Sequence, residues 1–311
     1  MQDKLDSHDT TNEIINGTDG NNILQGTRRN DEIYGHEGND KIFGYAGNDN
    51  LAGGAGNDII SGGNGDDHLE GNSGDDLLQG DAGNDNLEGG EGNDHLTGGE
   101  GDDRIFGNQG NDNIHGDKGD DTIEGGEGND NIKGGEGYDK IEGGEGNDII
   151  TGDAGRDYID GGLGNDNLAG GEDNDILIGG DGNDIITGDN GNDVIIGGSG
   201  ADQLTGGAGS DTYVYITVND SSVAAPDKIN DFETGIDKIN LNSLKQFNNE
   251  EVEIKKVVNF TRKINELLLD YNENTNVTNL KLDHDGNGQA EFNIEIIGKV
   301  DFEQDIITSE L

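Results

Sequence analysis

GGEGNDNIKGGEGYDKIEGGEGNDII, residues 125–150, is nearly the same nine letters written three times. The repetition extends far beyond this stretch, because a Gly recurs at every ninth residue from Gly17 through Gly206 without insertion or deletion. This gives 22 consecutive nonapeptides that end at Val214. Such a strict period indicates a repeat architecture, in which each unit packs on its neighbours.

The glycines hold fixed places within the repeat. The first position is Gly in all 22 copies and the fourth in 20, the sixth is Asp in 21, and the eighth is always apolar. Gly at fixed places marks backbone that other residues rarely adopt, so positions one to six predict a tight turn and the last three a very short strand. Only the eighth side chain of each strand, such as Leu51 or Ile60, should point inward.

Two turns and two strands make one coil of 18 residues, so the chain is predicted to be all-β: a parallel β-roll of about 11 coils followed by a small β-rich C-terminal cap module. The composition alone, with 58 Gly, 28% apolar residues and a formal charge of -50, would be typical of a disordered chain. One apolar side chain per repeat cannot offset the entropy of ordering the chain and the repulsion between stacked carboxylates. Cations must therefore take part in folding.

The sixth-position Asp supplies the predicted ligand. Repeats two apart lie above each other, so their turns bring two carboxylates and several carbonyl oxygens together, an all-oxygen site suited to Ca²⁺. About 18 sites are expected, because Asn22 replaces the Asp of the first repeat and Arg29 the fourth-position Gly of the second. The candidate calcium ligands are Asp40, Asp49, Asp58, Asp67, Asp76, Asp85, Asp94, Asp103, Asp112, Asp121, Asp130, Asp139, Asp148, Asp157, Asp166, Asp175, Asp184, Asp193, Asp202 and Asp211.

The units GGEGNDNIK, GGDGNDIIT and GGAGNDIIS resemble the RTX nonapeptide GGxGxDxUx, the repeat of the calcium-binding parallel β-roll. After Val214 the period stops and a second module begins. Residues 211–244 and 279–298, with DFEQDII near the end, resemble the segment that follows the β-roll in serralysin-type secreted metalloproteases. We expect three regions: a flexible leader or cap at 1–16, the β-roll at 17–214, and a cap and secretion-signal module at 215–311.

Catalytic motifs of that family are absent from the sequence. There is no HExxH, no G-x-S-x-G and no Cys, and the histidines at 8, 36, 68, 95, 115 and 284 lack metal-ligand spacing. His95 and His115 are expected diagonally on one sheet face, as two solvated side chains. We predict no catalytic residue and no catalytic activity.

Residues 283–288, DHDGNG, begin like an EF-hand loop, but Ile294 stands where the bidentate Glu should be. The alternating apolar residues on both sides favour a hairpin that turns at the Asn-Gly pair. An additional calcium site here stays the alternative.

Residues 1–16 contain no apolar signal-peptide core, and no stretch of the chain is apolar enough to span a membrane. The resemblance at the C-terminus implies export by a type I secretion apparatus, unfolded, into an extracellular medium whose calcium folds it. The acidity disfavours nucleic acid and anionic membranes as partners, and no stable membrane insertion is expected.

Two other functions stay open. The rod could be an extracellular adhesin, matrix or signalling protein, or the C-terminal part of a secreted RTX enzyme, although Met1 favours a whole protein. Ice binding is disfavoured, because the third position contains no Thr.

The strands of repeats 18, 20 and 22 place apolar residues at outward positions. Ile176, Ile178, Val194 and Ile196 should form a patch on one face that needs a cover. We expect the C-terminal module to fold back on this face with Phe232, Ile236, Ile239, Leu241 and Leu244, unless a partner protein covers it.

Overall fold

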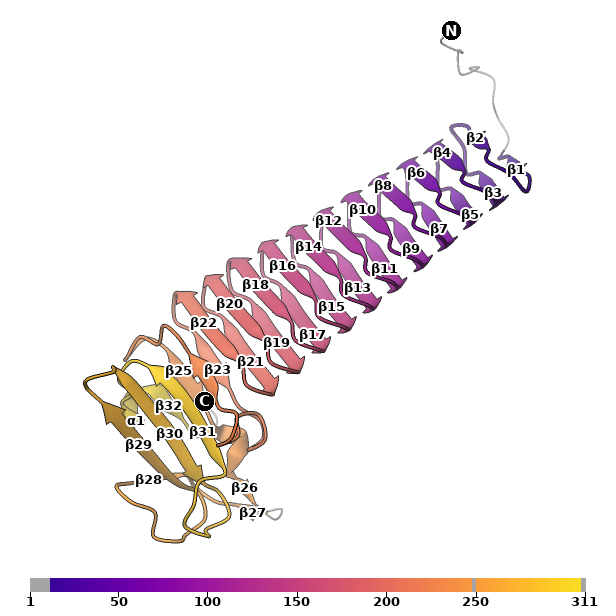
Figure 1. The fold of residues 1–311 in the computed structure, drawn as a ribbon. Helices are drawn as coiled ribbons and strands as arrows, with labels where there is room; N and C mark the ends of the chain where they lie inside the picture. The colour runs from indigo at the N-terminus through magenta and orange to yellow at the C-terminus, as the bar shows by residue number, and fades with distance from the viewer. Residues whose placement is uncertain (1–11, 248–249, 309–311) are drawn as a thin grey trace. The chain divides into compact units, whose positions relative to one another are not determined.

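The computed structural model describes residues 12–247 and 250–308 and divides into two compact units, Met1–Gly155 and Arg156–Leu311. Both units are built from short strands stacked in parallel, with successive strands alternating between two sheets (Figure 1). Counted over both units, the repeats form a parallel β-solenoid of about 11 turns. The predicted fold class is confirmed.

The first unit has two sheets, each in the order of its strands along the chain. The first sheet contains β1 (Ile14–Asn16), β3 (Glu32–Glu37), β5 (Asn50–Ala55), β7 (His68–Ser73), β9 (Asn86–Glu91), β11 (Arg104–Gln109), β13 (Thr122–Glu127) and β15 (Lys140–Glu145). The second sheet contains β2 (Ile23–Gln25), β4 (Lys41–Ala46), β6 (Ile59–Asn64), β8 (Leu77–Ala82), β10 (His95–Glu100), β12 (Asn113–Lys118), β14 (Asn131–Glu136) and β16 (Ile149–Ala154).

The register of the paired strands follows the period of the sequence, because two nine-residue repeats make one coil. Each paired residue lies 18 positions from its partner, as in His95 with Asn113 and Leu96 with Ile114. Equivalent repeat positions therefore form straight columns along each sheet. Each column contains the residues that occupy one repeat position in successive coils.

The strands are longer than predicted. Most contain six residues, which are positions seven to nine of one repeat and one to three of the next, so the expectation of a six-residue turn is wrong. Positions two and three pair with their equivalents in the next coil, as Tyr45 does with Gly63, whereas the first-position Gly44 is skipped. The backbone changes direction at position two, where Tyr45 has a φ of 77°, and the tight turn shrinks to positions four to six.

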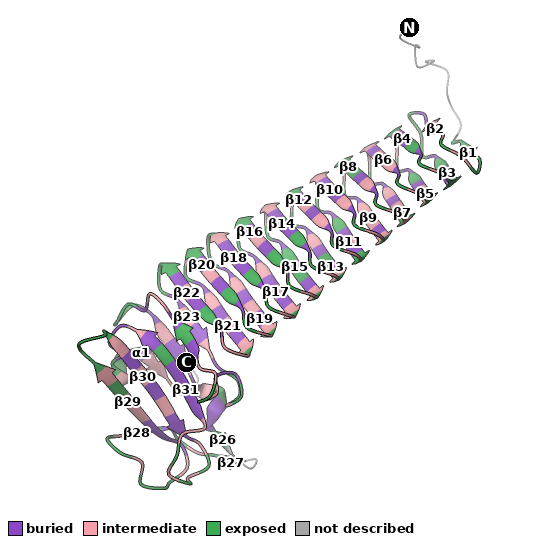
Figure 2. Ribbon diagram, viewed as in Figure 1, coloured by how far each residue is buried: buried purple, intermediate pink, exposed green. Residues whose placement is uncertain are grey.

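The core is one column of side chains in each sheet. The eighth-position residues from Ile33 to Leu204 are buried to 1% exposure or less, whereas positions seven and nine are half-buried or exposed (Figure 2). The predicted inward position is therefore confirmed.

In the second unit, successive repeat strands again alternate between two sheets. Its first sheet, in spatial order, is β17 (Tyr158–Leu163), β19 (Ile176–Asp181), β21 (Val194–Ser199), β23 (Thr212–Val214), β25 (Lys238–Asn240) and β32 (Ile306–Ile307). Its second sheet is β18 (Asn167–Glu172), β20 (Ile185–Asn190), β22 (Gln203–Ala208), β24 (Asp227–Ile229), β31 (Phe292–Ile297), β30 (Val277–Asp283), β29 (Glu266–Asn272) and β28 (Lys255–Val257). The turn η1 (Asn242–Lys245), the pair β26 (Gln246–Phe247) and β27 (Glu250–Glu251), and α1 (Phe302–Asp305) complete it.

The C-terminal module extends both sheets. β24 pairs in parallel with β22, and β25 pairs with β23, so the module adds strands to the open edges at the end of the repeats. Phe232, Ile239, Leu241 and Leu244 are buried as expected, whereas Ile236 is 44% exposed.

The C-terminal module closes the end of the repeats, as predicted for a cap, but it does so by pairing with the sheet edges and not by covering the apolar face of repeats 18 to 22. Ile176, Ile178, Val194 and Ile196 stay half-buried, and the strands that pair with β21 are β19 and β23. The module instead satisfies unpaired backbone N–H and C=O groups at the sheet edges, which cost more when left unpaired than half-exposed aliphatic side chains do.

Candidate metal sites

The sixth-position aspartates form a buried ladder along each edge of the roll. Each is at most 3% exposed, and one carboxylate oxygen is fixed by the backbone. The backbone N–H of Asp112 donates to Oδ1 of Asp130 at 2.8 Å, and the N–H of Asp130 donates to Oδ1 of Asp148 at 2.8 Å. The N–H of Asp40 donates to Asp58 in the same way, at 2.7 Å.

The second carboxylate oxygen of many of these residues is buried and accepts no hydrogen bond from any described residue. A buried carboxylate oxygen without a donor is costly unless a cation or proton neutralises it. This holds for Oδ2 of Asp40, Asp49, Asp58, Asp67, Asp76, Asp85, Asp94, Asp103, Asp112, Asp121, Asp130, Asp175, Asp184, Asp193 and Asp202.

The first-position glycine explains why these oxygens have room. A Cβ at Gly125 would collide with both Oδ2 of Asp130 and the carbonyl oxygen of Gly143 in the next coil. A carboxylate oxygen and a carbonyl oxygen therefore face the same small space. Such all-oxygen surroundings suit a hard divalent cation such as Ca²⁺.

The charge of the ladder is poorly tolerated in the metal-free fold. Burial raises the pKa of Asp67 and of Asp76 to about 7. The hydrogen bond that each carboxylate accepts from a backbone N–H lowers the pKa, whereas the neighbouring carboxylates raise it further. Burial likewise raises the pKa of Asp49 and of Asp94 to about 6. The metal-free ladder therefore favours protonation, and a bound cation would reverse this preference.

The ladder closes differently at its N-terminal end. The backbone N–H and the hydroxyl of Thr27 donate to Oδ2 of Asp31 at 2.6 and 2.9 Å. In the first repeat, the N–H of Thr18 donates to the side-chain oxygen of Asn22 at 2.9 Å. In these two end turns the side-chain oxygens of Asp31 and Asn22 accept hydrogen bonds from the protein itself, whereas the Oδ2 atoms described above do not.

Two aspartates beyond the repeats continue the ladder, and sequence reasoning missed them. The N–H of Asp202 donates to Oδ1 of Asp227 at 3.0 Å, and that of Asp211 donates to Oδ1 of Asp237 at 3.1 Å. Burial raises the pKa of Asp227 to about 8. A signal was present, because DKIN occurs at 227–230 and again at 237–240 and matches the last four positions of the repeat.

The fifth repeat position also has a role that the sequence did not reveal. The backbone N–H of Asn39 donates to the side-chain oxygen of Asn21 at 3.0 Å, and Asn48 donates to Asn30 in the same way. Asn or Asp at this position therefore links successive coils on the outside of the turn, which explains its frequency there.

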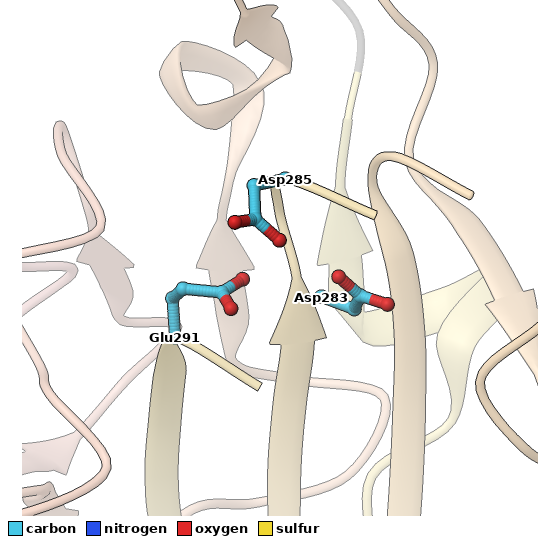
Figure 3. Close-up of side chains that lie close together, drawn as sticks. All are labelled: Asp283, Asp285 and Glu291. Carbon is cyan, nitrogen blue, oxygen red and sulfur yellow. The ribbon is translucent and has the colours of Figure 1, made fainter. Parts of the chain in front are cut away.

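A separate acidic cluster lies at the loop of residues 284–291. β30 and β31 form the predicted hairpin, but its connection is longer than an Asn-Gly turn. Asp283, Asp285 and Glu291 each bring one carboxylate oxygen within 4.8 Å of the others (Figure 3). Both oxygens of Asp283 accept backbone hydrogen bonds, from Gly286 at 2.8 Å and Gly288 at 2.9 Å, so the loop is closed by its own groups.

His95 and His115 lie side by side on the second sheet, as predicted, with ring centroids 5.7 Å apart. Burial lowers the pKa of His115 below the usual value for histidine. Along the described part of the chain, neither belongs to a group of three metal-ligating side chains. Within the same residues, no helix could span a lipid bilayer.

Comparison with known proteins gives a consistent pattern. The family described as Peptidase M10 serralysin C terminal matches residues 25–308. Serralysin A of Dickeya chrysanthemi is 42% identical over 96 residues, which are 31% of this chain and 20% of the relative. Serralysin of Proteus mirabilis is 43% identical over 96 residues, 30% of this chain and 20% of the relative. The chain thus spans about a fifth of the length of the curated relatives it matches.

Among solved structures, the AlgE6R3 subunit of the mannuronan C5-epimerase of Azotobacter vinelandii is similar to 48% of this chain and 81% of that subunit. The TM-score of this match is 0.37 and the sequence identity is 23%.

Proposed function

The chain belongs to the serralysin C-terminal family of the M10 peptidases, and from this we propose that it is a secreted RTX β-roll that folds on binding extracellular calcium. The observation that carries the proposal is the row of buried carboxylate oxygens without hydrogen-bond donors. The aspartates from Asp40 to Asp211 would hold the ions, about 18 in number, together with carbonyl oxygens of the turns. Bound calcium would supply the positive charge that a buried carboxylate ladder lacks.

Folding would then depend on the compartment. The unneutralised ladder opposes the fold where calcium is scarce, so the chain would stay unfolded inside the cell. Millimolar calcium outside would stabilise the roll, because an ion that binds only the folded state shifts the folding equilibrium. Export by a type I secretion apparatus, with the signal near the C-terminus, is supported by the family membership and fits a chain that folds only after transport.

We propose no catalytic activity for these 311 residues, since they contain no HExxH motif. One second candidate is favoured by an observation. Because the similarity covers only 20% of each of these relatives, the chain could serve as the C-terminal part of a secreted enzyme. The intact mass of the protein recovered from culture medium distinguishes the two functions.

Far-UV circular dichroism tests calcium-coupled folding. In excess EGTA the spectrum should be that of a disordered chain, and β signal should appear cooperatively between about 0.1 and 1 mM Ca²⁺, the range of extracellular modules. Magnesium at the same concentrations is the control, because it demands tighter octahedral geometry. A full β spectrum in chelator at neutral pH contradicts the proposal.

A further inference from the structure

Two adjoining hollows lie on the first sheet of the first unit. Each has a volume of about 420 Å³, and they share Glu70 and Asn72. The first hollow is also lined by Tyr34 and His36, and the second hollow is also lined by Glu88 and Asn108. They follow one another along β3 to β11, which Figure 1 shows in sequence.

The hollows arise from an alternation in one column of the sheet. At the second repeat position, side chains and glycines alternate from coil to coil, in the order His36, Gly54, Asn72, Gly90 and Asn108. Each glycine leaves a gap between two longer side chains. From Gly126 onward the column contains only glycine up to Gly144, so the walls end there.

The carboxylates of the hollows are held in place by neighbours. Asn86 Nδ2 donates to His68 Nδ1 at 2.8 Å, so His68 carries its proton on Nε2 and donates to Glu70 at 2.9 Å. The same amide donates to Glu88 at 3.3 Å. Glu70 and Glu88 pair in register, one coil apart, which is about 4.8 Å.

The residues in line with these two carboxylates define the kind of ligand. Their column contains Tyr34, Ala52, Glu70, Glu88 and Phe106 in this order and continues with Glu124. The ring of Tyr34 lines one hollow, and Phe106 is the next residue in the column after Glu88. Among the described residues, no lysine or arginine lines either hollow, so anionic ligands are disfavoured. Held carboxylates at coil spacing suit ammonium groups joined by short methylene chains, and aromatic faces attract such cations.

We propose that the two hollows bind a linear polyamine, with Glu70 and Glu88 as the counter-ions of its ammonium groups. The asparagine and glutamine side chains of the walls would accept the remaining N–H donors. The glycine gaps would admit the methylene segments between them.

Isothermal titration with spermine tests this on the calcium-saturated full chain, at constant ionic strength. Glu70→Gln with Glu88→Gln should weaken binding about tenfold, since two charge-assisted contacts are lost. Glu124→Gln with Glu142→Gln is the matched control, because these residues occupy the same column and are exposed on strands without the walls. That control should weaken binding less than about twofold.

A second variant fills one hollow without changing charge. Ala52→Phe should weaken spermine binding several-fold and keep the fold, because Phe106 occupies the equivalent position. Ala169→Phe, at the same repeat position in the second unit, should have no effect. Equal loss in both glutamate pairs, no spermine binding, or tighter binding of a neutral oligosaccharide than of spermine overturns the proposal.

Discussion

Asp130 lies within the ladder of the first unit, and its replacement by Asn isolates the role of one carboxylate charge. Asn keeps the side-chain oxygen that accepts the N–H of Asp112 but replaces the buried Oδ2 with an uncharged group. Because Asp130 faces Asp112 on one side and Asp148 on the other, two proposed calcium sites lose a ligand charge.

The expected loss follows from linkage. At about 10 mM calcium, an ion with a dissociation constant of about 0.1 to 1 mM stabilises the folded state by about 1.4 to 2.7 kcal/mol. Losing both ions should lower the free energy of unfolding by about 3 to 5 kcal/mol. Asp130→Ala should cost about 1 to 3 kcal/mol more, because it also leaves the buried N–H of Asp112 without an acceptor.

Urea unfolding followed by circular dichroism at about 10 mM calcium measures these differences, and equilibrium dialysis counts the ions. Lys133→Ala is the control, since Lys133 is exposed on β14 close to Asp130 in the chain and should leave both readouts unchanged. If Asp130→Asn binds as many ions as the unaltered chain with the same stability, the ladder does not hold calcium at this position.

Two further predictions address acid and export. In EGTA the roll should gain β signal as the pH falls from about 8 to about 5. The pKa values of Asp67 and Asp76 are raised from 3.8 to about 7, so the folded state binds protons more tightly than the unfolded chain does. Circular dichroism across this pH range measures the gain, and a loss of β signal on acidification contradicts the reasoning. Deleting residues 301–311, which include β32, should retain the protein inside cells that carry a matching type I transporter, whereas deleting residues 1–16 should have little effect on export. Immunoblots of cells and medium measure both outcomes, and equal secretion of both truncations refutes the C-terminal signal.

The repeat period of the sequence determined the coil. Eighth-position residues such as Leu51 and Ile60 pack on residues 18 positions away, so their burial follows from counting alone. The sixth-position aspartates were likewise identifiable, because every turn repeats the same local geometry. The contacts that build a solenoid lie between neighbouring repeats, and a strict period encodes them directly.

Other features exist only when the coils are stacked. The strands reach six residues because positions such as Tyr45 and Ala46 gain backbone partners in the next coil, which a single repeat does not contain. The hollows beside Glu70 need side chains from several coils at once. The placement of the C-terminal module was decided by the open edges of β22 and β23, whose unpaired backbone groups outweigh an apolar face. Asp227 and Asp237 join the ladder for the same reason, since their strands add to those edges and no repeat period marks them. Where two segments share no repeat period, the sequence does not show which of their residues contact each other. Those contacts depend on which backbone groups the folded chain leaves unpaired.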